Sequence, residues 1–210
     1  MQTPNSNCWP SSTSWSNLNT TLQGHLIRSI PPASVCYPSQ PNYSETACET
    51  IRSQWTNSLF HAADPSSIDY PLWANNSCPP IFPNGTSING DVHAGEKGCQ
   101  IGAYPVYVVD ARTEEHVAEA LKWVGEKNVR VVVKATGHSH QGRSTGYGSL
   151  SIWTHNLRGI EYIQDFRPTH CPINGSQPAA RIGAGETGGD IQREMAKHNM
   201  VVVTGADPVS

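Results

Sequence analysis

Charged residues are scarce in this chain. They make up 15% of its 210 residues, whereas typical soluble proteins contain about 25%. The formal net charge is −3, so no excess of basic residues is present to attract nucleic acid or an anionic membrane surface. Long apolar runs are also absent. The longest are Val131–Val133 and Met200–Val203, far short of the roughly 20 residues that span a membrane. The composition predicts a soluble folded protein with no nucleic-acid partner and no membrane partner.

No two cysteines have CxxC spacing, which argues against a structural zinc site. The six cysteines are an even number on a polar, proline-rich chain, a pattern typical of disulfides, with reduced cytosolic thiols as the alternative. We expect the cysteines to be oxidised in pairs. Because neighbours in sequence close short loops, Cys36 is expected to pair with Cys48, and Cys78 with Cys99. Cys171, on a proline-rich loop, is expected to be a further disulfide partner.

Five Asn-x-Ser/Thr sequons also favour secretion, since this tripeptide is the acceptor for N-linked glycans. Their asparagines are Asn19, Asn42, Asn75, Asn84 and Asn174. The first ten residues are polar and contain no apolar segment of the kind found in a signal peptide. We therefore expect a secreted, extracellular glycoprotein in a mature or trimmed form.

A change in composition divides the chain near residue 101. Residues 1–101 are expected to form a disulfide-rich, sequon-rich, loop-rich N-terminal extension with one helix over Glu45–Phe60, where apolar residues recur at helical spacing. Residues 102–210 alternate between strands and amphipathic helices, which predicts an α+β fold. The expected strands are Tyr104–Val109, Val129–Lys134, Leu150–Trp153, Glu161–Ile163, Ala180–Ile182 and Met200–Val203. The expected helices are one capped by Thr113 and one over Thr187–His198.

The most informative stretch is the glycine-rich loop Lys134–Ser149, which follows a strand expected to be buried. Its glycines allow backbone N–H groups to approach an anion and permit positive φ. One interpretation is a nucleotide P-loop, because the loop nearly matches GxxxxGK[ST], although a strand and not a helix is expected to follow it. A second is a metal site, whose ligands would be His138, His140 and either His155 or His170. A third is a flavin site.

Five stretches favour the flavin site through their order along the chain. They are Cys8–Ser11 with Trp15, Tyr104–Thr113, Thr136–Gly146, Ser149–Leu157 and Gly183–Thr187. In this order they resemble the FAD-binding domain of the vanillyl-alcohol oxidase / p-cresol methylhydroxylase superfamily, and within it the fungal secreted isoamyl alcohol oxidase-like and berberine bridge enzyme-like proteins. The resemblance implies that residues 102–210 are a PCMH-type FAD-binding domain of two α/β subdomains, incomplete at its C-terminus.

The resemblance also implies a covalent flavin. In that family the histidine of the Gly-His pair is bonded to the flavin ring, and His138 occupies this position, with an ordinary loop histidine as the alternative. Doubly tethered members carry a second bond from a Trp-Cys-Pro turn, where this chain has Ala206-Asp207-Pro208, so a single tether is implied. The expected FAD-binding residues are Ala135, Thr136, Gly137, His138, Ser139, Gly142, Gly146, Gly205 and Asp207. No metal is expected.

By the same resemblance, the protein is expected to be an FAD-dependent oxidoreductase. A small alcohol or secondary metabolite would pass a hydride to the flavin, and O2 would reoxidise it. The alternatives are a flavin-dependent oxidative cyclase of secondary metabolism and a non-catalytic secreted module that binds glycans through surface Trp and Tyr. Because the chain stops at Ser210, just after an expected strand and its turn, the catalytic base is expected beyond that residue, and the 210-residue chain alone is expected to be inactive.

Overall fold

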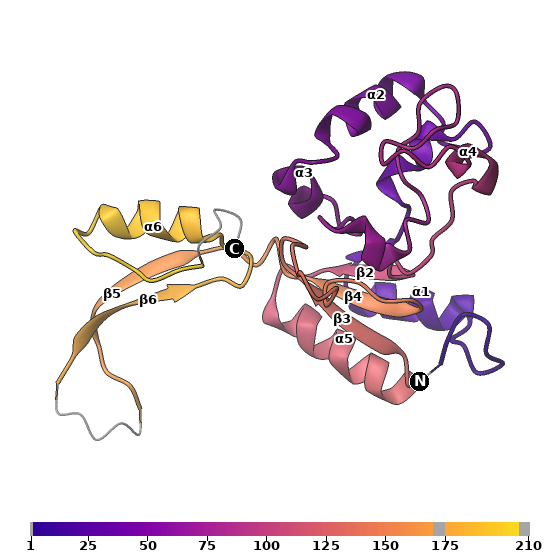
Figure 1. The fold of residues 1–210 in the computed structure, drawn as a ribbon. Coiled ribbons are helices and arrows are strands. Elements are labelled where there is room, and N and C mark those ends of the chain that lie inside the picture. The colour runs from indigo at the N-terminus through magenta and orange to yellow at the C-terminus, as the bar shows by residue number, and fades with distance from the viewer. Residues whose placement is uncertain (1, 170–174, 206–210) are drawn as a thin grey trace.

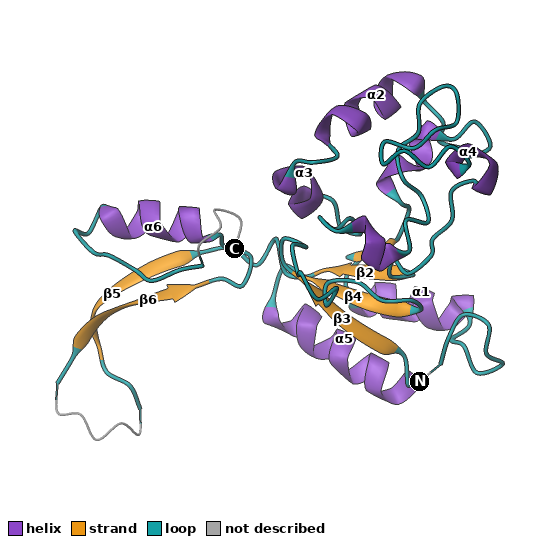
Figure 2. Cartoon of the chain, in the orientation of Figure 1, coloured by secondary structure: helices purple, strands orange, loops and turns teal. Residues whose placement is uncertain are grey.

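Two lobes make up the protein in the computed structural model, which describes residues 2–169 and 175–205 (Figure 1). The larger lobe contains a four-stranded sheet, and the smaller lobe contains a two-stranded sheet with one helix (Figure 2). The mixture of helices with parallel and antiparallel strands confirms the expected α+β class. None of the described helices is long and apolar enough to cross a membrane.

The sheet of the larger lobe has the strand order β1-β2-β4-β3. Its strands are β1 (Leu26–Arg28), β2 (Tyr107–Asp110), β3 (Arg130–Lys134) and β4 (Ser149–Trp153). Three of them, β2, β4 and β3, run parallel, and β1 joins β2 in the antiparallel direction. The crossover that parallel strands require is supplied between β2 and β3 by helix α5 (Glu114–Lys127). The sequence pattern identifies the three parallel strands but not β1.

Helices α1 (Ser12–Thr21) and α5 (Glu114–Lys127) lie along one face of this sheet (Figure 1). Thr113 caps α5 as expected, because its side-chain oxygen accepts a hydrogen bond from the backbone N–H of His116 at 3.4 Å. Carboxylates in the first turn of α5 add to this cap, since negative charge is stabilised at a helix N-terminus.

Trp15 lies at the centre of the core between α1, α5 and the sheet. Its ring centroid is 4.3 Å from that of Tyr107 and 4.4 Å from that of Trp123. The other buried members of this core are Leu18, Leu22, Val109, Ala111, Ala120, Val124, Val129, Leu150 and Ile152. Residues near the N-terminus thus share a core with residues beyond 102, and the domain boundary at residue 101 stays a prediction.

Residues 30–103, here called the disulfide module, lie over the other face of the sheet (Figure 1). The module contains η1 (Pro32–Cys36), α2 (Glu45–Gln54), α3 (Ser58–Ala63), η2 (Pro71–Ala74) and α4 (Ala94–Lys97). The expected disulfides Cys36–Cys48 and Cys78–Cys99 are confirmed. Cys8 is exposed and has no disulfide partner among the described residues, and Cys171 lies outside them.

The expectation of one helix over Glu45–Phe60 is wrong. The structure has α2 and α3 instead, because Asn57 begins a new helix: its side-chain oxygen accepts a hydrogen bond from the backbone N–H of Leu59 at 3.0 Å. The break turns Leu59 to the surface, where it is 61% exposed, while Cys48 and Trp55 stay buried.

The smaller lobe is a β-hairpin covered by a helix. Strands β5 (Ile160–Phe166) and β6 (Gln177–Ile182) are antiparallel, and α6 (Gly188–Ala196) packs on them through Ile191 and Met195. These elements match the predicted strands and the predicted helix, with longer strands than expected.

Two expectations about apolar segments are wrong. Met200–Val203 is not a strand, because an extended segment becomes one only by pairing with a neighbour, and no described strand pairs with it. Its Val201 and Val203 side chains are 96% and 98% exposed. The strand before the glycine-rich loop, β3, is not buried either, because it lies at the edge of the sheet, and Val133 is 55% exposed.

Each disulfide is expected to stabilise the full-length protein. The bridges close loops of 12 and 21 residues, for which the lost freedom of the unfolded chain corresponds to about 3 kcal/mol. Replacing both cysteines of one bridge by Ser should therefore lower the free energy of unfolding, measured with urea, by about this amount. Cys8→Ser is the matched control and should change it little. Equal stability of the control and of both paired variants would contradict a stabilising role for the bridges.

Candidate functional site

The carboxyl ends of the parallel strands β2, β4 and β3 meet at one edge of the larger sheet. The glycine-rich loop leaves β3 at this edge, and residues 154–158 leave β4 beside it. The two segments are joined where the backbone N–H of Thr154 donates to the carbonyl of Lys134 at 2.9 Å. Ligands of open α/β sheets bind at this edge, outside the carboxyl ends of the strands. The loop expected from the sequence to bind a cofactor therefore lies in the right place for one.

A run of backbone N–H groups without partners distinguishes this loop. None of the five N–H groups from Ala135 to Ser139 donates a hydrogen bond to a described residue. Gly137, in the middle of the run, is buried and has φ +101°, a conformation that favours glycine. Successive free N–H groups in such a turn bind anions. The donors therefore fit the diphosphate of a dinucleotide, and His138 follows Gly137 with a half-buried side chain.

Lys134 anchors the start of the loop. Its side chain is 1% exposed, and Nζ donates to the backbone carbonyls of His61, Ala62 and Asp64 at 3.0, 3.5 and 2.7 Å. These carbonyls lie at the C-terminal end of α3, where helix carbonyls have no intrahelical partner and a positive charge is favoured. Burial lowers the pKa of Lys134 to about 8, although Asp64 and Asp69 act in the opposite direction.

The disulfide module also supports the loop directly. The backbone N–H of Asp69 donates to the carbonyl of Gly137 at 3.3 Å. A Cβ atom at position 137 would lie 2.9 Å from Cε of Lys134 and 3.2 Å from the carbonyl oxygen of Ser67. Asp64 holds this segment in place by accepting from the backbone N–H of Ser67 at 2.7 Å. The position of His138 thus depends on residues 61–69 as well as on its own loop.

The remaining expected site residues are spread more widely. Gly142 continues the loop, but its N–H donates to the carbonyl of Ser139 at 3.1 Å and is not free for a ligand. Gly146 lies beside Arg130, at the opposite end of β3 from Ala135–Ser139, so the structure does not bring them together. Gly205 is exposed in the segment after α6, and Asp207 lies outside the described residues.

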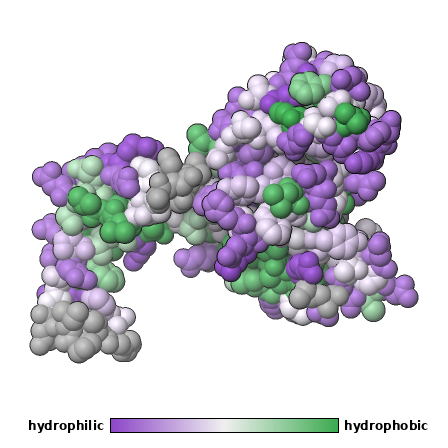
Figure 3. All heavy atoms as spheres, viewed as in Figure 1, coloured by the Kyte–Doolittle hydropathy of each residue, from purple (hydrophilic) through white to green (hydrophobic). Residues whose placement is uncertain are grey.

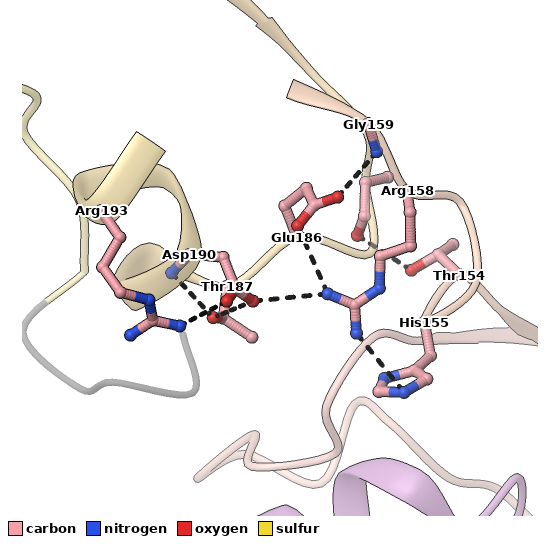
Figure 4. Close-up of polar contacts among 9 residues, drawn as sticks. Thr154, His155, Arg158, Gly159, Glu186, Thr187, Asp190 and Arg193 are labelled. Atoms are coloured by element: carbon pink, nitrogen blue, oxygen red, sulfur yellow. Dashed lines mark hydrogen bonds and ion pairs between the residues drawn. The ribbon is translucent and has the colours of Figure 1, made fainter. Parts of the chain in front are cut away.

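A network of polar contacts joins the two lobes next to the loop (Figure 4). The hydroxyl of Thr154 donates to the carbonyl of Ala184 at 3.2 Å. Arg158 reaches Glu186 at 3.4 Å and Asp190 at 3.5 Å. The backbones approach closely here, because a Cβ atom on Gly185 would lie 2.4 Å from the carbonyl oxygen of Thr154. The stretch Gly183–Thr187 is therefore required for packing of the smaller lobe against the end of β4.

His155 lies inside this junction. Its ring stacks on Trp153 with centroids 5.1 Å apart, and its Nδ1 atom is buried without a hydrogen-bond partner among the described residues. Burial, followed by the positive charge of Arg158, lowers the pKa of His155. The ring is therefore held in its neutral form near neutral pH and presents an unused polar atom beside the candidate site.

The structure bears on the two other interpretations of the loop. No helix begins after the glycines, since the chain enters β4 at Ser149, and a P-loop requires that helix. No group of three His, Cys, Asp or Glu side chains in the described ranges is placed to hold a metal ion. The His140 ring packs against that of Tyr70 at a tilt of 39°, with ring centroids 5.0 Å apart, and His170 is not among the described residues.

The flavin interpretation agrees with the family to which the sequence belongs. The sequence profile of the FAD binding domain family matches residues 105–209, which is half of the chain and includes the whole glycine-rich loop. The chain therefore belongs to the FAD binding domain family.

Individual relatives are similar over nearly the whole chain. FAD-linked oxidoreductase ZEB1 of Gibberella zeae is 33% identical over 205 residues, 98% of this chain and 33% of its own. Bifunctional decalin synthase calF of Penicillium decumbens is 31% identical over 95% of this chain and 32% of its own. The crystal structure of the VAO-type flavoprotein MtVAO615 from Myceliophthora thermophila matches all of this chain and 36% of its own, with 36% identity and a TM-score of 0.86. This chain spans about a third of the length of the curated relatives it matches.

Sequence reasoning misses the residues that position the loop. Thr154 and Gly185 lie in two of the stretches that carry the family resemblance, and Lys134 begins the glycine-rich loop, but no sequence pattern gives any of them a role. One signal is visible for Lys134: a lysine ends the apolar run of β3, directly before the glycine-rich loop, in a chain with few charges. Its partners, the carbonyls of residues 61–64, are more than 60 residues away, and no sequence pattern connects them with Lys134.

A pH dependence of stability is expected from Lys134. Its folded-state pKa of about 8 lies below the ordinary value of 10.5, so between these pH values the unfolded state binds the proton and the folded state does not. The free energy of unfolding should therefore rise with pH across this window, by up to about 3 kcal/mol.

The measurement compares urea unfolding of the wild type and Lys134→Met from pH 7 to 10. The wild type should gain stability relative to the variant above pH 8, with little change between pH 7 and 8. Lys127→Met, which removes an exposed lysine at the end of α5, is the control and should run parallel to the wild type. A constant difference between wild type and Lys134→Met at every pH would contradict the buried charge.

Proposed function

We propose that this chain is the FAD-binding part of an FAD-dependent oxidoreductase that oxidises a small alcohol or a secondary metabolite. The observation that carries the proposal is the run of free N–H groups from Ala135 to Ser139 at the carboxyl edge of a parallel sheet. Membership of the FAD binding domain family and the similarity to FAD-linked oxidoreductase ZEB1 support it.

The chain's own residues would bind and orient the cofactor. The N–H groups of Ala135–Ser139 would hold the diphosphate of FAD. Lys134 would hold the start of the loop in position by its hydrogen bonds to the end of α3. Gly142, Gly146, Gly205 and Asp207 remain proposed contributors. When bound, FAD supplies the acceptor for the two electrons removed from the substrate.

We further propose that His138 is bonded covalently to the flavin. The residue directly follows the buried Gly137, and its half-buried side chain belongs to the same short run as the proposed diphosphate donors. A covalent bond would suit a secreted protein, from which a dissociable cofactor is lost by dilution. Secretion itself is proposed from the two disulfides of the module, and O2 is the proposed electron acceptor.

A second candidate is a flavin-dependent oxidative cyclase. The specific observation that favours it is the similarity to bifunctional decalin synthase calF over 95% of this chain. Both candidates would use the same cofactor site and differ in substrate and in product. Peroxide release with simple alcohols would favour the oxidase, whereas ring formation from a secondary metabolite would favour the cyclase.

The covalent bond is tested by His138→Ala in the full-length protein. The wild type should keep its yellow colour in the pellet after acid precipitation, because a covalent cofactor survives denaturation, whereas the variant should release its FAD into the supernatant. His140→Ala is the matched control, since His140 lies two residues further along the same loop with an exposed side chain, and its flavin should stay in the pellet. Pelleted flavin in His138→Ala would assign the bond to another residue.

A further inference from the structure

The sequon at Asn84 lies in a tight hairpin turn of the disulfide module. Ile81 and Ser87 pair as an antiparallel bridge, and the N–H of Phe82 donates to the carbonyl of Thr86 at 2.8 Å. The N–H of Gly85 donates to the carbonyl of Phe82 at 2.8 Å, and Gly85 has φ +83°. This is a three-residue hairpin loop in which a turn is followed by a glycine in the left-handed region.

The turn is held from outside as well. The N–H of Gly95 in α4 donates to the carbonyl of Gly85 at 2.9 Å, and a Cβ atom on Gly95 would lie 2.9 Å from the Cα of Gly85. Arg52 donates to the carbonyl of Ile81 at 2.9 Å and lies over the Phe82 ring, with its guanidinium carbon 5.6 Å from the ring centroid. Contacts within the disulfide module therefore hold the backbone of the sequon and the ring beside it in the folded chain.

An exposed aromatic ring lies two residues before the acceptor asparagine. Phe82 is 44% exposed, and Phe82, Asn84 and Tyr43 line one hollow of about 550 Å³. The lobe that contains this hollow presents a few apolar groups among hydrophilic neighbours (Figure 3). The C–H groups on the flat face of a hexose carry partial positive charge, and they pack on the negative face of an aromatic ring.

The acceptor group of Asn84 is available. Its side-chain oxygen accepts from the N–H of Thr86 at 3.0 Å, whereas its side-chain nitrogen, the atom that a sugar would modify, makes no hydrogen bond to a described residue. Asn19 differs in burial and in setting: it is half-buried in helix α1, whereas Asn84 is exposed in a turn. Its oxygen accepts from the N–H of Leu26 in β1 at 3.1 Å, seven residues away. The two sequons therefore differ in structure although they are equivalent in sequence.

We propose that Asn84 carries an N-linked glycan whose first N-acetylglucosamine packs on the ring of Phe82. In the transfer, the amide nitrogen of Asn84 bonds to C1 of the sugar, the bond from C1 to the lipid diphosphate of the glycan donor breaks, and the amide proton leaves with the diphosphate. The proposal depends on passage through a secretory pathway and is independent of the proposed redox chemistry. The glycan covers apolar side chains that the fold leaves exposed and stiffens the hairpin.

The site is tested on the full-length protein directed into the secretory pathway of a yeast by a host leader. Glycopeptide mass spectrometry, on secreted and on cell-retained protein, should find Asn84 nearly fully occupied and Asn19 unmodified. Because the leader is supplied, this result does not depend on where the native protein is located, and FAD content is read separately. An unmodified Asn84 in both fractions would overturn the proposal.

Packing on Phe82 is tested with the glycan trimmed by endoglycosidase to one N-acetylglucosamine. Thr86→Ala removes the sequon and keeps the backbone N–H that bonds to Asn84. In the wild-type background, the glycan should slow amide hydrogen exchange of the 80–88 peptide about fivefold relative to Thr86→Ala. In a Phe82→Leu background the glycan should have little effect, and Phe82→Tyr should restore it. An equal effect in the Leu and Phe backgrounds would overturn the packing contact.

Discussion

The buried ammonium group of Lys134 is the interaction on which the candidate site depends. A charge with 1% exposure and no carboxylate in direct contact is costly unless polar groups surround it. The carbonyls at the C-terminal end of α3 offset part of that cost, because a helix leaves them unpaired, although burial still lowers the pKa of Lys134. The same contacts join the disulfide module to the last residue of β3, so one side chain links the folding of the module to the geometry of the cofactor loop.

The disulfide module therefore supports the glycine-rich loop. Its two bridges and buried aromatic residues hold residues 61–69 beneath the loop, and Asp69 bonds to Gly137. Apolar burial alone would leave this segment free to slide, whereas hydrogen bonds to a buried charge and to a glycine carbonyl fix its register. Across the site, the close approach of Gly185 to Thr154 sets the smaller lobe in the same way. The loop that contains His138 thus lies between the Asp69–Gly137 hydrogen bond on one side and the Gly185–Thr154 contact on the other.

Much of the local structure could be predicted from neighbouring residues. Thr113 and Thr187 cap the predicted helices, the apolar spacing identifies α5 and α6, and short loops predict the pairing of Cys36 with Cys48 and of Cys78 with Cys99. The break between α2 and α3 could also be predicted, because Asn57 is a good N-cap residue, but the periodic apolar residues around it favour a single helix over Glu45–Phe60. The capping residue marks the helix boundary, whereas the apolar spacing continues across it and hides the boundary.

The sequence by itself determined the α+β class, the loop with His138 and the family resemblance, because these depend on residues close together in the chain. Only the tertiary structure decided that β4 lies between β2 and β3, that β3 is an exposed edge strand, and that Met200–Val203 has no strand partner in the described chain. It also decided that Lys134 meets α3. Strand order and burial result from contacts between segments far apart in sequence, and an apolar run such as Val131–Val133 reads the same at a sheet's edge as at its centre.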